Sequence, residues 1–406
     1  MKKLVEKYKD IMIDTTLAIP IGIIIGALDA VFGRVLLEIT DIRNQYVLLP
    51  FLAFAGIIII LLYQKFNEEC AKGMTLVFQA GLGHRDHIPK MLIPLVMITT
   101  WITHLFGGSA GREGVAVQLG ATVAHTIGKR LHRPNNSRIL LIAGMAAGFA
   151  GLFQTPVAAT LFAMEVMVVG VVWLNALLPA LTAAFIASST SHFLGLEKFF
   201  VSIDDKLIWK VDTIWKIILV SICFGVAGSG FAFLLKKAKE RFGNWIKSPL
   251  LRISVMGAGL SILLLIFHAG RYAGLGTNLI SNAFSGNDIY GYDWFLKLLL
   301  TVLTLAAGFQ GGEVTPLFAI GATLGTVLGT ILGLPVMLIA ALGYAAVFGS
   351  ATKTLLAPMF IGVEVFGPQC IVYFAIVCSI SYVMSGNHTI YGAQRNYNYF
   401  DSTTSI

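Results

Sequence analysis

Charged residues are scarce in this chain. Only 12% of its 406 residues are Asp, Glu, Lys or Arg, whereas 56% are hydrophobic. A soluble domain carries about 25% charged residues, because its surface faces water. With half that share and a mean hydropathy of +0.80, much of this surface has to face lipid. The composition excludes an ordinary soluble globular protein and predicts a polytopic membrane protein.

Metal-ligating patterns are also missing. The chain has four cysteines but no CxxC pair, and no histidines stand at metal-ligand spacing. We therefore expect no metal site and no cofactor. The 29 Lys and Arg exceed the 21 Asp and Glu, yet the cations form short clusters between apolar runs without interleaved aromatic residues. This pattern indicates cytoplasmic loops rather than a nucleic acid partner, and it places the N-terminus in the cytoplasm of a bacterial cell, with the chain crossing the plasma (inner) membrane several times.

Long uninterrupted hydrophobic runs are few, since 42 glycines break them. The apolar runs cover residues 16–31, 46–63, 91–106, 139–153, 161–178, 214–235, 253–267, 294–307, 316–332, 336–348 and 370–383. A full helical span needs about 20 residues, and several of these runs are shorter. Short, glycine-interrupted runs predict helices that enter the membrane and end near its middle, where they line a cavity or contact a ligand.

An internal repeat is present. Residues 111–122 align with 312–323 at an offset of 201, and Gly144 aligns with Gly343 at an offset of 199. The aligned Glu-Val pairs at 165–166 and 364–365 extend the match. We expect one transmembrane domain over residues 1–406 with repeat halves at about 12–200 and 210–391, a short tail at 392–406 and no cytosolic regulatory domain. The residues alone leave the relative orientation of the halves open.

A glycine-rich turn, Gly-Gly-Ser-Ala-Gly-Arg-Glu-Gly at 107–114, joins two apolar runs. A helix that opens on such a turn offers unpaired N–H groups and a positive dipole end, which bind anions. An ionisable residue within a spanning region indicates a functional site. We expect ionised Glu113 to occupy an anion's place and to leave it when protonated, which couples anion entry to proton binding. The alternative is a first-turn glutamate that only complements the helix dipole.

Residues 311–315, Gly-Gly-Glu-Val-Thr, open the next apolar run in the same way. We expect Glu313 to be a second buried carboxylate at a helix start. Two carboxylates that share a site cannot both hold their charge easily, which leaves one of them able to carry a proton. Thr315 either donates its hydroxyl to an anion or caps the helix. Residues 73–76 form a third candidate helix start, which is weak alone because a methionine there is usually a packing residue.

Residues 107–111 also match the G-x-S-x-G nucleophile elbow in letters, with His104 nearby. That motif works only on a strand-turn-helix, whereas the preceding segment reads as a membrane helix. An intramembrane serine protease that uses Ser109 is the enzyme alternative. Our primary expectation is a secondary active ion transporter, which is not an enzyme.

At these residues the chain resembles the CLC family of chloride channels and anion/proton exchangers. Residues 111–114, Gly-Arg-Glu-Gly, match the family's gating-glutamate motif, and residues 311–321 resemble its G-G-x-F-x-P filter segment. Residues 153–165 resemble the following helix pair, and Tyr391 falls where the family's C-terminal filter tyrosine is expected. The resemblance covers essentially the whole chain. It implies an all-α, CLC-type fold of two repeated and inverted halves with tilted and re-entrant helices, assembled as a homodimer with one pore in each subunit.

Several positions depart from the family pattern. Met74 stands where the filter serine would be, Val115 replaces the proline after Gly-Arg-Glu-Gly, and Val314 replaces the filter phenylalanine after an unusual Glu313. Val166 stands where the internal proton-transfer glutamate of the chloride exchangers would be. This set resembles the bacterial fluoride/proton antiporter branch, which exports fluoride.

The resemblance implies a mechanism in which Glu113 swings between the anion pathway and solvent, while Glu313 with Thr315 replaces the internal glutamate. Its expected partners are fluoride, protons and the lipid bilayer. Arg112 either positions the turn or pairs with a neighbouring carboxylate. A chloride channel or chloride/proton exchanger of the same family stays open, because the residues do not prove fluoride over chloride. The expected anion-binding residues are Met74, Thr75, Gly111, Arg112, Gly114, Val314, Thr315 and Tyr391.

Overall fold

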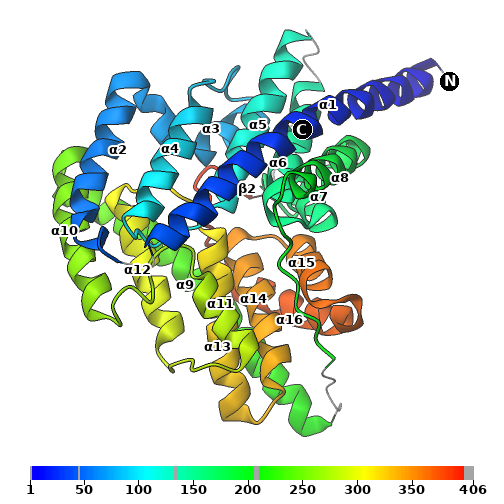
Figure 1. The fold of residues 1–406 in the computed structure, drawn as a ribbon. Coiled ribbons are helices and arrows are strands. Elements are labelled where there is room, and N and C mark those ends of the chain that lie inside the picture. Colours follow the sequence, from blue (N-terminus) through cyan, green and yellow to red (C-terminus); the bar gives the residue numbers. More distant parts are fainter. Residues whose placement is uncertain (1, 44–45, 132–135, 205–209, 397–406) are drawn as a thin grey trace.

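A computed structural model describes residues 2–43, 46–131, 136–204 and 210–396. The described chain is almost wholly helical, as the glycine-interrupted apolar runs predict (Figure 1). Six of its helices are long and apolar enough to cross a membrane, by length and composition. Other apolar helices are only 10–17 residues long. The predicted mixture of full spans and partial spans is therefore present, and the all-α prediction is confirmed.

The helices of the first half are α1 (Lys2–Arg43), α2 (Leu52–Phe66), α3 (Met74–Gly81), α4 (Leu92–Leu105), α5 (Glu113–Arg130), α6 (Asn136–Phe153), α7 (Pro156–Glu165) and α8 (Leu177–Phe193). Short 3₁₀ turns occupy Leu49–Phe51, Glu68–Lys72 and Leu174–Ala176. The helices of the second half are α9 (Val211–Trp245), α10 (Pro249–Ile266), α11 (Thr277–Ser285), α12 (Asp293–Ala307), α13 (Val314–Leu332), α14 (Val336–Thr352), α15 (Leu356–Phe366) and α16 (Ile371–Met384), with a 3₁₀ turn at Pro368–Cys370.

Some boundaries differ from the sequence prediction. The run 161–178 is not one segment, because it contains the end of α7, the short strand β1 (Val168–Val169), a 3₁₀ turn and the start of α8. Gly170 lies there with φ +82°, a conformation that other residues rarely adopt. Helices α11 and α15 were not predicted. One of the cationic clusters for which the charge pattern predicts a loop, at residues 236–241, lies inside α9 instead.

The segment after Tyr391 joins the fold instead of forming a separate tail. Strand β2 (Arg395–Asn396) pairs in parallel with β1. The Gln394 side chain donates hydrogen bonds to the carbonyls of Val166 (2.7 Å) and Thr352 (3.0 Å). The chain therefore returns from the second half to the first beside the end of α7. The rest of the predicted tail, residues 397–406, lies outside the described residues.

The internal repeat predicted from the sequence is visible as two equivalent helix pairs. A Cβ at Gly120 would collide with the carbonyl of Gly144, so α5 and α6 approach closely there. The aligned glycines of the second half make the same close approach, since a Cβ at Gly321 would collide with the carbonyl of Gly343 where α13 meets α14. Helices α5 and α6 lie in the upper part of Figure 1, and α13 and α14 in the lower part. Small residues at these crossings allow backbones to pack closely in a membrane protein.

A second equivalence crosses between the halves. Glu165, at the end of α7, accepts hydrogen bonds from the first N–H groups of α15, including that of Ala357 at 2.7 Å. Glu364, its aligned counterpart in α15, accepts hydrogen bonds from Val157 N (3.2 Å) and Ala158 N (2.8 Å) at the start of α7. Two equivalent groups that make the same contact on each other's half require a local two-fold relation. The halves are therefore related by a local two-fold axis that passes between α7 and α15.

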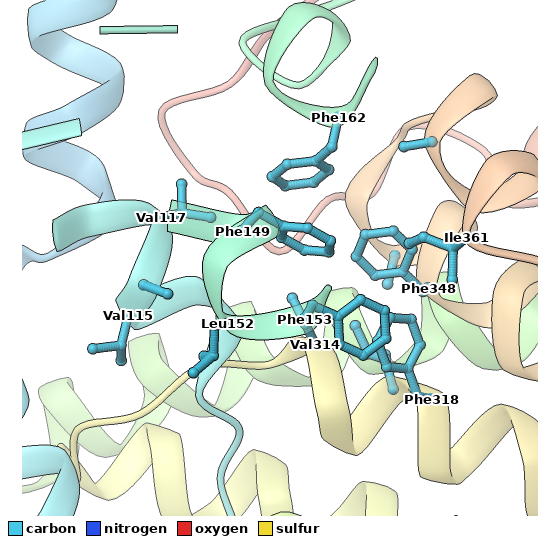
Figure 2. Packing of buried hydrophobic residues seen from close by; sticks show 14 of the residues in the cluster. Val115, Val117, Phe149, Leu152, Phe153, Phe162, Val314, Phe318, Phe348 and Ile361 are labelled. Atoms are coloured by element: carbon cyan, nitrogen blue, oxygen red, sulfur yellow. The ribbon is translucent and has the colours of Figure 1, made fainter. Parts of the chain in front are cut away.

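An aromatic cluster fills the space between the halves (Figure 2). Phe149 of α6 stacks on Phe162 of α7 with ring centroids 5.2 Å apart. Phe348 of α14, which aligns with Phe149, lies 5.8 Å from Phe162 and 5.2 Å from Phe318. All four rings are fully buried. Close packing of large rings resists deformation, so this cluster holds α6, α7, α13 and α14 in fixed relative positions.

Candidate functional site

The two glycine-rich turns meet at the centre of the molecule. Gly111 N donates to Gly312 O at 2.5 Å, and Gly312 N donates to Gly111 O at 2.7 Å. A Cβ on Gly111 would lie 2.9 Å from Gly312 O and 2.8 Å from Pro316 Cδ, closer than real Cβ atoms come. Glycine is therefore required for this approach. Because Gly111 and Gly312 are aligned residues of the repeat, the local two-fold axis passes between them.

Glu113 is the first residue of α5, but its carboxylate does not cap that helix. It reaches across to the start of α13, where Thr315 N donates to Oε2 at 3.1 Å. The Thr315 hydroxyl donates to the same oxygen. Glu113 is 1% exposed, so this carboxylate occupies a buried helix N-terminus of the other half. Such a position binds anions, because several N–H groups and the positive helix dipole end point at it.

Arg112 pairs with the carboxylate next to it, one of the two roles expected for this residue. Its Nε lies 3.6 Å from Glu113 Oε1, and Arg112 N approaches Oε2 at 3.4 Å. The Arg112 side chain is 17% exposed. The guanidinium therefore supports the negative charge of Glu113 from its own turn, while Thr315 supports it from the opposite half.

Glu313 occupies the N-cap position of α13. It is a second carboxylate at a helix start, where its side chain is half-buried and lines a cavity. Its Oε2 would lie 3.7 Å from a Cβ on Gly114, the second residue of α5. Among the described residues, no other residue donates a hydrogen bond to this carboxylate. Glu313 therefore lies beside the start of α5 with its charge open to the cavity.

The cavity has a volume of about 390 Å³. Of the residues predicted for the anion site, it is lined by Met74, Thr75 and Tyr391, together with Glu313. Met74 begins α3, and the Tyr391 ring packs on Phe78 of the same helix at 5.2 Å. The cavity thus brings together residues from α3, the start of α13 and the C-terminal segment, as the sequence predicted.

The other predicted site residues lie behind this cavity. The residues that do not line it are Gly111, Arg112, Glu113, Gly114, Val314 and Thr315, and of these Val314 and Thr315 are almost fully buried. They form the interior contact between α5 and α13. The predicted site is therefore divided into an accessible part around Glu313 and an enclosed part around Glu113.

Several polar residues of the cavity were missed by sequence reasoning. Gln118, five residues after Glu113 in α5, lines the cavity, and its Oε1 atom is buried without a hydrogen bond partner. Three cations, Lys72, Lys239 and Arg252, line it as well. Lys239 and Arg252 come from α9 and α10, so only the fold brings them to the cavity. These charges create a positive potential that favours anions.

The geometry argues against the serine protease alternative. The Ser109 hydroxyl contacts Thr301 Oγ1 (2.8 Å) and Lys297 Nζ (2.9 Å), and its residue is fully buried. The ring nitrogens of His104 contact the carbonyls of Thr100 (2.8 Å) and Ala110 (3.0 Å) instead. No described hydrogen bond joins His104 to Ser109. The serine and histidine therefore lack the contact that activates a nucleophile, and both serve to hold the turn that leads to Glu113.

Comparisons with known proteins agree with this architecture. A sequence profile described as voltage gated chloride channel matches residues 55–386. A chloride/fluoride channel protein of Pseudomonas syringae pv. tomato is 34% identical over 92% of this chain and 84% of its own length. The H+/Cl− exchange transporter ClcA of Yersinia pseudotuberculosis is 28% identical over 80% of this chain and 73% of its own length.

A solved structure gives the same result. The crystal structure of a CLC-type fluoride/proton antiporter superposes with a TM-score of 0.93 and 49% identity, over 95% of this chain and 98% of the other. The identity, the coverage and the matched profile agree with one another. The chain therefore belongs to the voltage gated chloride channel family, the CLC family of anion channels and transporters.

Proposed function

We propose that this protein is a fluoride/proton antiporter that exports fluoride in exchange for protons. The observation that carries the proposal is the position of the Glu113 carboxylate, which rests on the N-terminus of α13 in the place of an anion. Fluoride is small, accepts strong hydrogen bonds and is basic. It could therefore replace the carboxylate at Thr315 N and the Thr315 hydroxyl.

Protonation of Glu113 supplies the coupling. A neutral carboxyl loses its attraction to the helix dipole, which is worth up to about 2 kcal/mol in a partly buried site. Its hydrogen bonds also weaken, since those to a charged group contribute about 1.5–3 kcal/mol and those to a neutral group about 1 kcal/mol. The protonated side chain leaves the start of α13, and an anion enters in its place. Return of the carboxylate releases the proton and expels the anion.

Glu313 serves as the second proton carrier in this scheme. It lines the cavity that Glu113 does not reach, and it lies beside Gly114 at the start of α5. A proton that Glu113 releases toward the cytoplasm would meet Glu313 before it leaves through the cavity. Met74, Thr75 and Tyr391 border the same cavity and complete the anion site. Met74 has no hydroxyl to donate to an anion, so hydrogen bonds to fluoride would come from the hydroxyls of Thr315, Thr75 and Tyr391 and from backbone N–H groups.

We place the protein in a bacterial plasma membrane as a homodimer, with its N-terminus and the cationic cavity on the cytoplasmic side. The support is the positive-inside rule, which assigns the side rich in Lys and Arg to the cytoplasm. Large apolar side chains of the spanning helices, among them Ile262 and Ile266 of α10, are exposed on the isolated chain. Lipid and a second subunit would cover them. The whole chain, residues 1–406, acts as one transport domain in this proposal.

Proteoliposomes test the proposal directly. Vesicles loaded with fluoride or with chloride are diluted into anion-free buffer, and ion-selective and pH electrodes follow efflux and external proton uptake together. We expect fluoride efflux with proton uptake in a fixed ratio, and an imposed proton gradient should drive fluoride against its own gradient. Chloride efflux should be slower by at least about tenfold, a difference of roughly 1.4 kcal/mol. Fluoride movement that carries no protons, or coupled movement of chloride alone, would reject the proposal.

A further inference from the structure

A second polar cavity lies at the other end of α5, far along the helix from Glu113. Its volume is about 420 Å³, and it lies between the loop after α3, the end of α5, the start of α6 and the 3₁₀ turn Leu174–Ala176. The residues used below are Arg85, Asp86, His125, Lys129, Arg138 and Trp173, all of which line it. We propose that this cavity binds a phosphate group, carried by a lipid headgroup or free in solution.

The charges of the lining favour an anion. Three cations line the cavity against one carboxylate, that of Asp86. Arg85 is held by a bidentate pair with Glu69 (2.5 and 2.7 Å). Lys129 lies 3.6 Å from the Asp86 carboxylate, whose side chain is 99% exposed, so this pair is weak. Arg138 has no carboxylate partner among the described residues.

Arg138 is arranged to bind a planar or tetrahedral oxyanion. Its guanidinium carbon lies 4.9 Å from the centre of the Trp173 ring. This cation–π contact holds the guanidinium beside the ring. A guanidinium fixed in this way can donate two parallel hydrogen bonds to one phosphate, which a lysine cannot do.

Two buried polar atoms of the lining residues have no partner in the described chain. One is Trp173 Nε1, which can only donate. The other is Nδ1 of His125, a residue that is 2% exposed and whose Nε2 contacts the carbonyl of Asp86 at 3.1 Å. Each unsatisfied buried group costs about 1–3 kcal/mol. A phosphate supplies acceptor oxygens for the indole N–H, and a phosphate that carries a hydroxyl also has a donor for Nδ1.

The volume of the cavity and its position in the membrane both favour a ligand that carries a phosphate group. A cavity of about 420 Å³ falls within the range of small-molecule sites, about 300–1,000 Å³, and is far larger than a halide needs. It lies beside Lys129 and Arg130, the cations that end α5, on the side where the positive-inside rule places the cytoplasmic headgroups. A phosphate with a small substituent therefore fits better than either transported ion. The inference does not depend on the proposed transport reaction.

Thermal unfolding of the full-length protein in a neutral detergent tests this site. The probes are inorganic phosphate and dioctanoyl phosphatidylglycerol, with dioctanoyl phosphatidylcholine as the zwitterionic control for effects of added lipid. We expect at least one phosphate probe to raise Tm by about 2–4 °C at saturation, and phosphatidylcholine to change it little. A response to the anionic lipid alone identifies the headgroup as the source, whereas a response to both probes shows that free phosphate also binds.

Two variants and one control localise the effect. Trp173→Phe keeps an aromatic ring beside Arg138 and removes the pyrrole part of the indole with its N–H, and it should weaken apparent affinity for the phosphate probe about tenfold. Arg138→Gln should abolish the shift. Arg241→Gln removes an exposed arginine in α9 and should leave the shift unchanged. The inference is overturned if neither probe stabilises the wild-type protein, or if Trp173→Phe responds like the wild type. If Arg138→Gln does not fold, the response of Trp173→Phe to the phosphate probes still tests the site.

Discussion

One matched pair of glutamates and one unmatched glutamate link the two halves. Glu165 and Glu364 occupy aligned positions, and each caps a helix start of the other half. Glu113 also caps a helix start of the other half, at Thr315. Its aligned residue is Val314, however, so nothing returns the contact at the start of α5. Glu165 and Glu364 are therefore a structural link between the halves. Because Glu113 has no counterpart, the start of α5 receives no carboxylate cap from the other half.

The second carboxylate near this centre does not restore the symmetry. Glu313 aligns with Arg112, so a carboxylate in one half stands where a cation stands in the other. Glu313 lies beside Gly114 and lines the cavity, whereas Arg112 pairs with the buried Glu113. The asymmetry gives the centre an enclosed acid and an accessible acid.

Glu113→Gln should have the largest effect on transport, because it removes the charge of the glutamate that has no counterpart in the other half. Glutamine cannot carry a proton, so proton uptake in the vesicle assay should fall to background, a loss of about 100-fold or more. Fluoride should then move only down its own gradient, with a rate independent of pH. Glu364→Gln is the matched control, since it alters a carboxylate that also caps a helix of the other half. Residual proton uptake in Glu113→Gln would show that another group carries the proton.

A smaller effect is expected from Glu313→Gln. Glu313 accepts no hydrogen bond from another described residue, so its loss should leave Tm within about 1 °C of the wild type. Proton-coupled fluoride efflux should slow about tenfold, because the proton loses its carrier in the cavity. The electrodes measure both quantities in one experiment. A rate equal to the wild type would remove Glu313 from the proton route, and a collapse of Tm would give it a structural role instead.

Thr315→Val should have a more moderate effect. Valine has nearly the shape of threonine but lacks the hydroxyl that donates to Glu113, and the Thr315 N–H remains. The loss of one charge-assisted hydrogen bond, about 1.5–3 kcal/mol, should lower the affinity for fluoride about tenfold and favour the displaced state of Glu113. Thr315→Ser retains the hydroxyl and should restore the affinity. Equal fluoride affinities in all three proteins would exclude the hydroxyl from the anion site.

The sequence predicted the members of this site better than its contacts. Glycine-rich helix starts and the repeat offsets placed Glu113, Glu313 and Thr315 at two equivalent turns, and the structure brings these turns together. That Glu113 caps α13 rather than α5 was not predictable, because its partner Thr315 is 202 residues away in the chain. The cavity cations Lys239 and Arg252 were missed for the same reason.

Predicted helix boundaries were wrong where one apolar run contained the end of one helix and the start of the next. The run 161–178 contains Glu165, whose carboxylate fixes the end of α7 by bonding the start of α15. The partner helix was itself not predicted, so its role in ending α7 could not be inferred. Periodicity reports how a segment faces its surroundings, but it does not reveal which distant backbone group ends a helix.

Substitutions of the two matched glutamates, Glu165 and Glu364, should change transport least. They should nevertheless lower the thermal stability of the protein clearly. Glu165→Gln removes the charge from a carboxylate that accepts three backbone hydrogen bonds at the start of α15. Each such bond loses part of its charge-assisted strength, about 1 kcal/mol, so Tm should fall by several degrees. Because Glu165 lies outside both the cavity lining and the α5–α13 contact, the ratio of protons to fluoride should not change.

Glu364→Gln should lower Tm in the same way. Combining the two substitutions should lower Tm by less than the sum of the single effects, since both glutamates hold the same pair of helices. A change in the coupling ratio with unchanged Tm would reverse the assignment and make the matched glutamates part of the proton route.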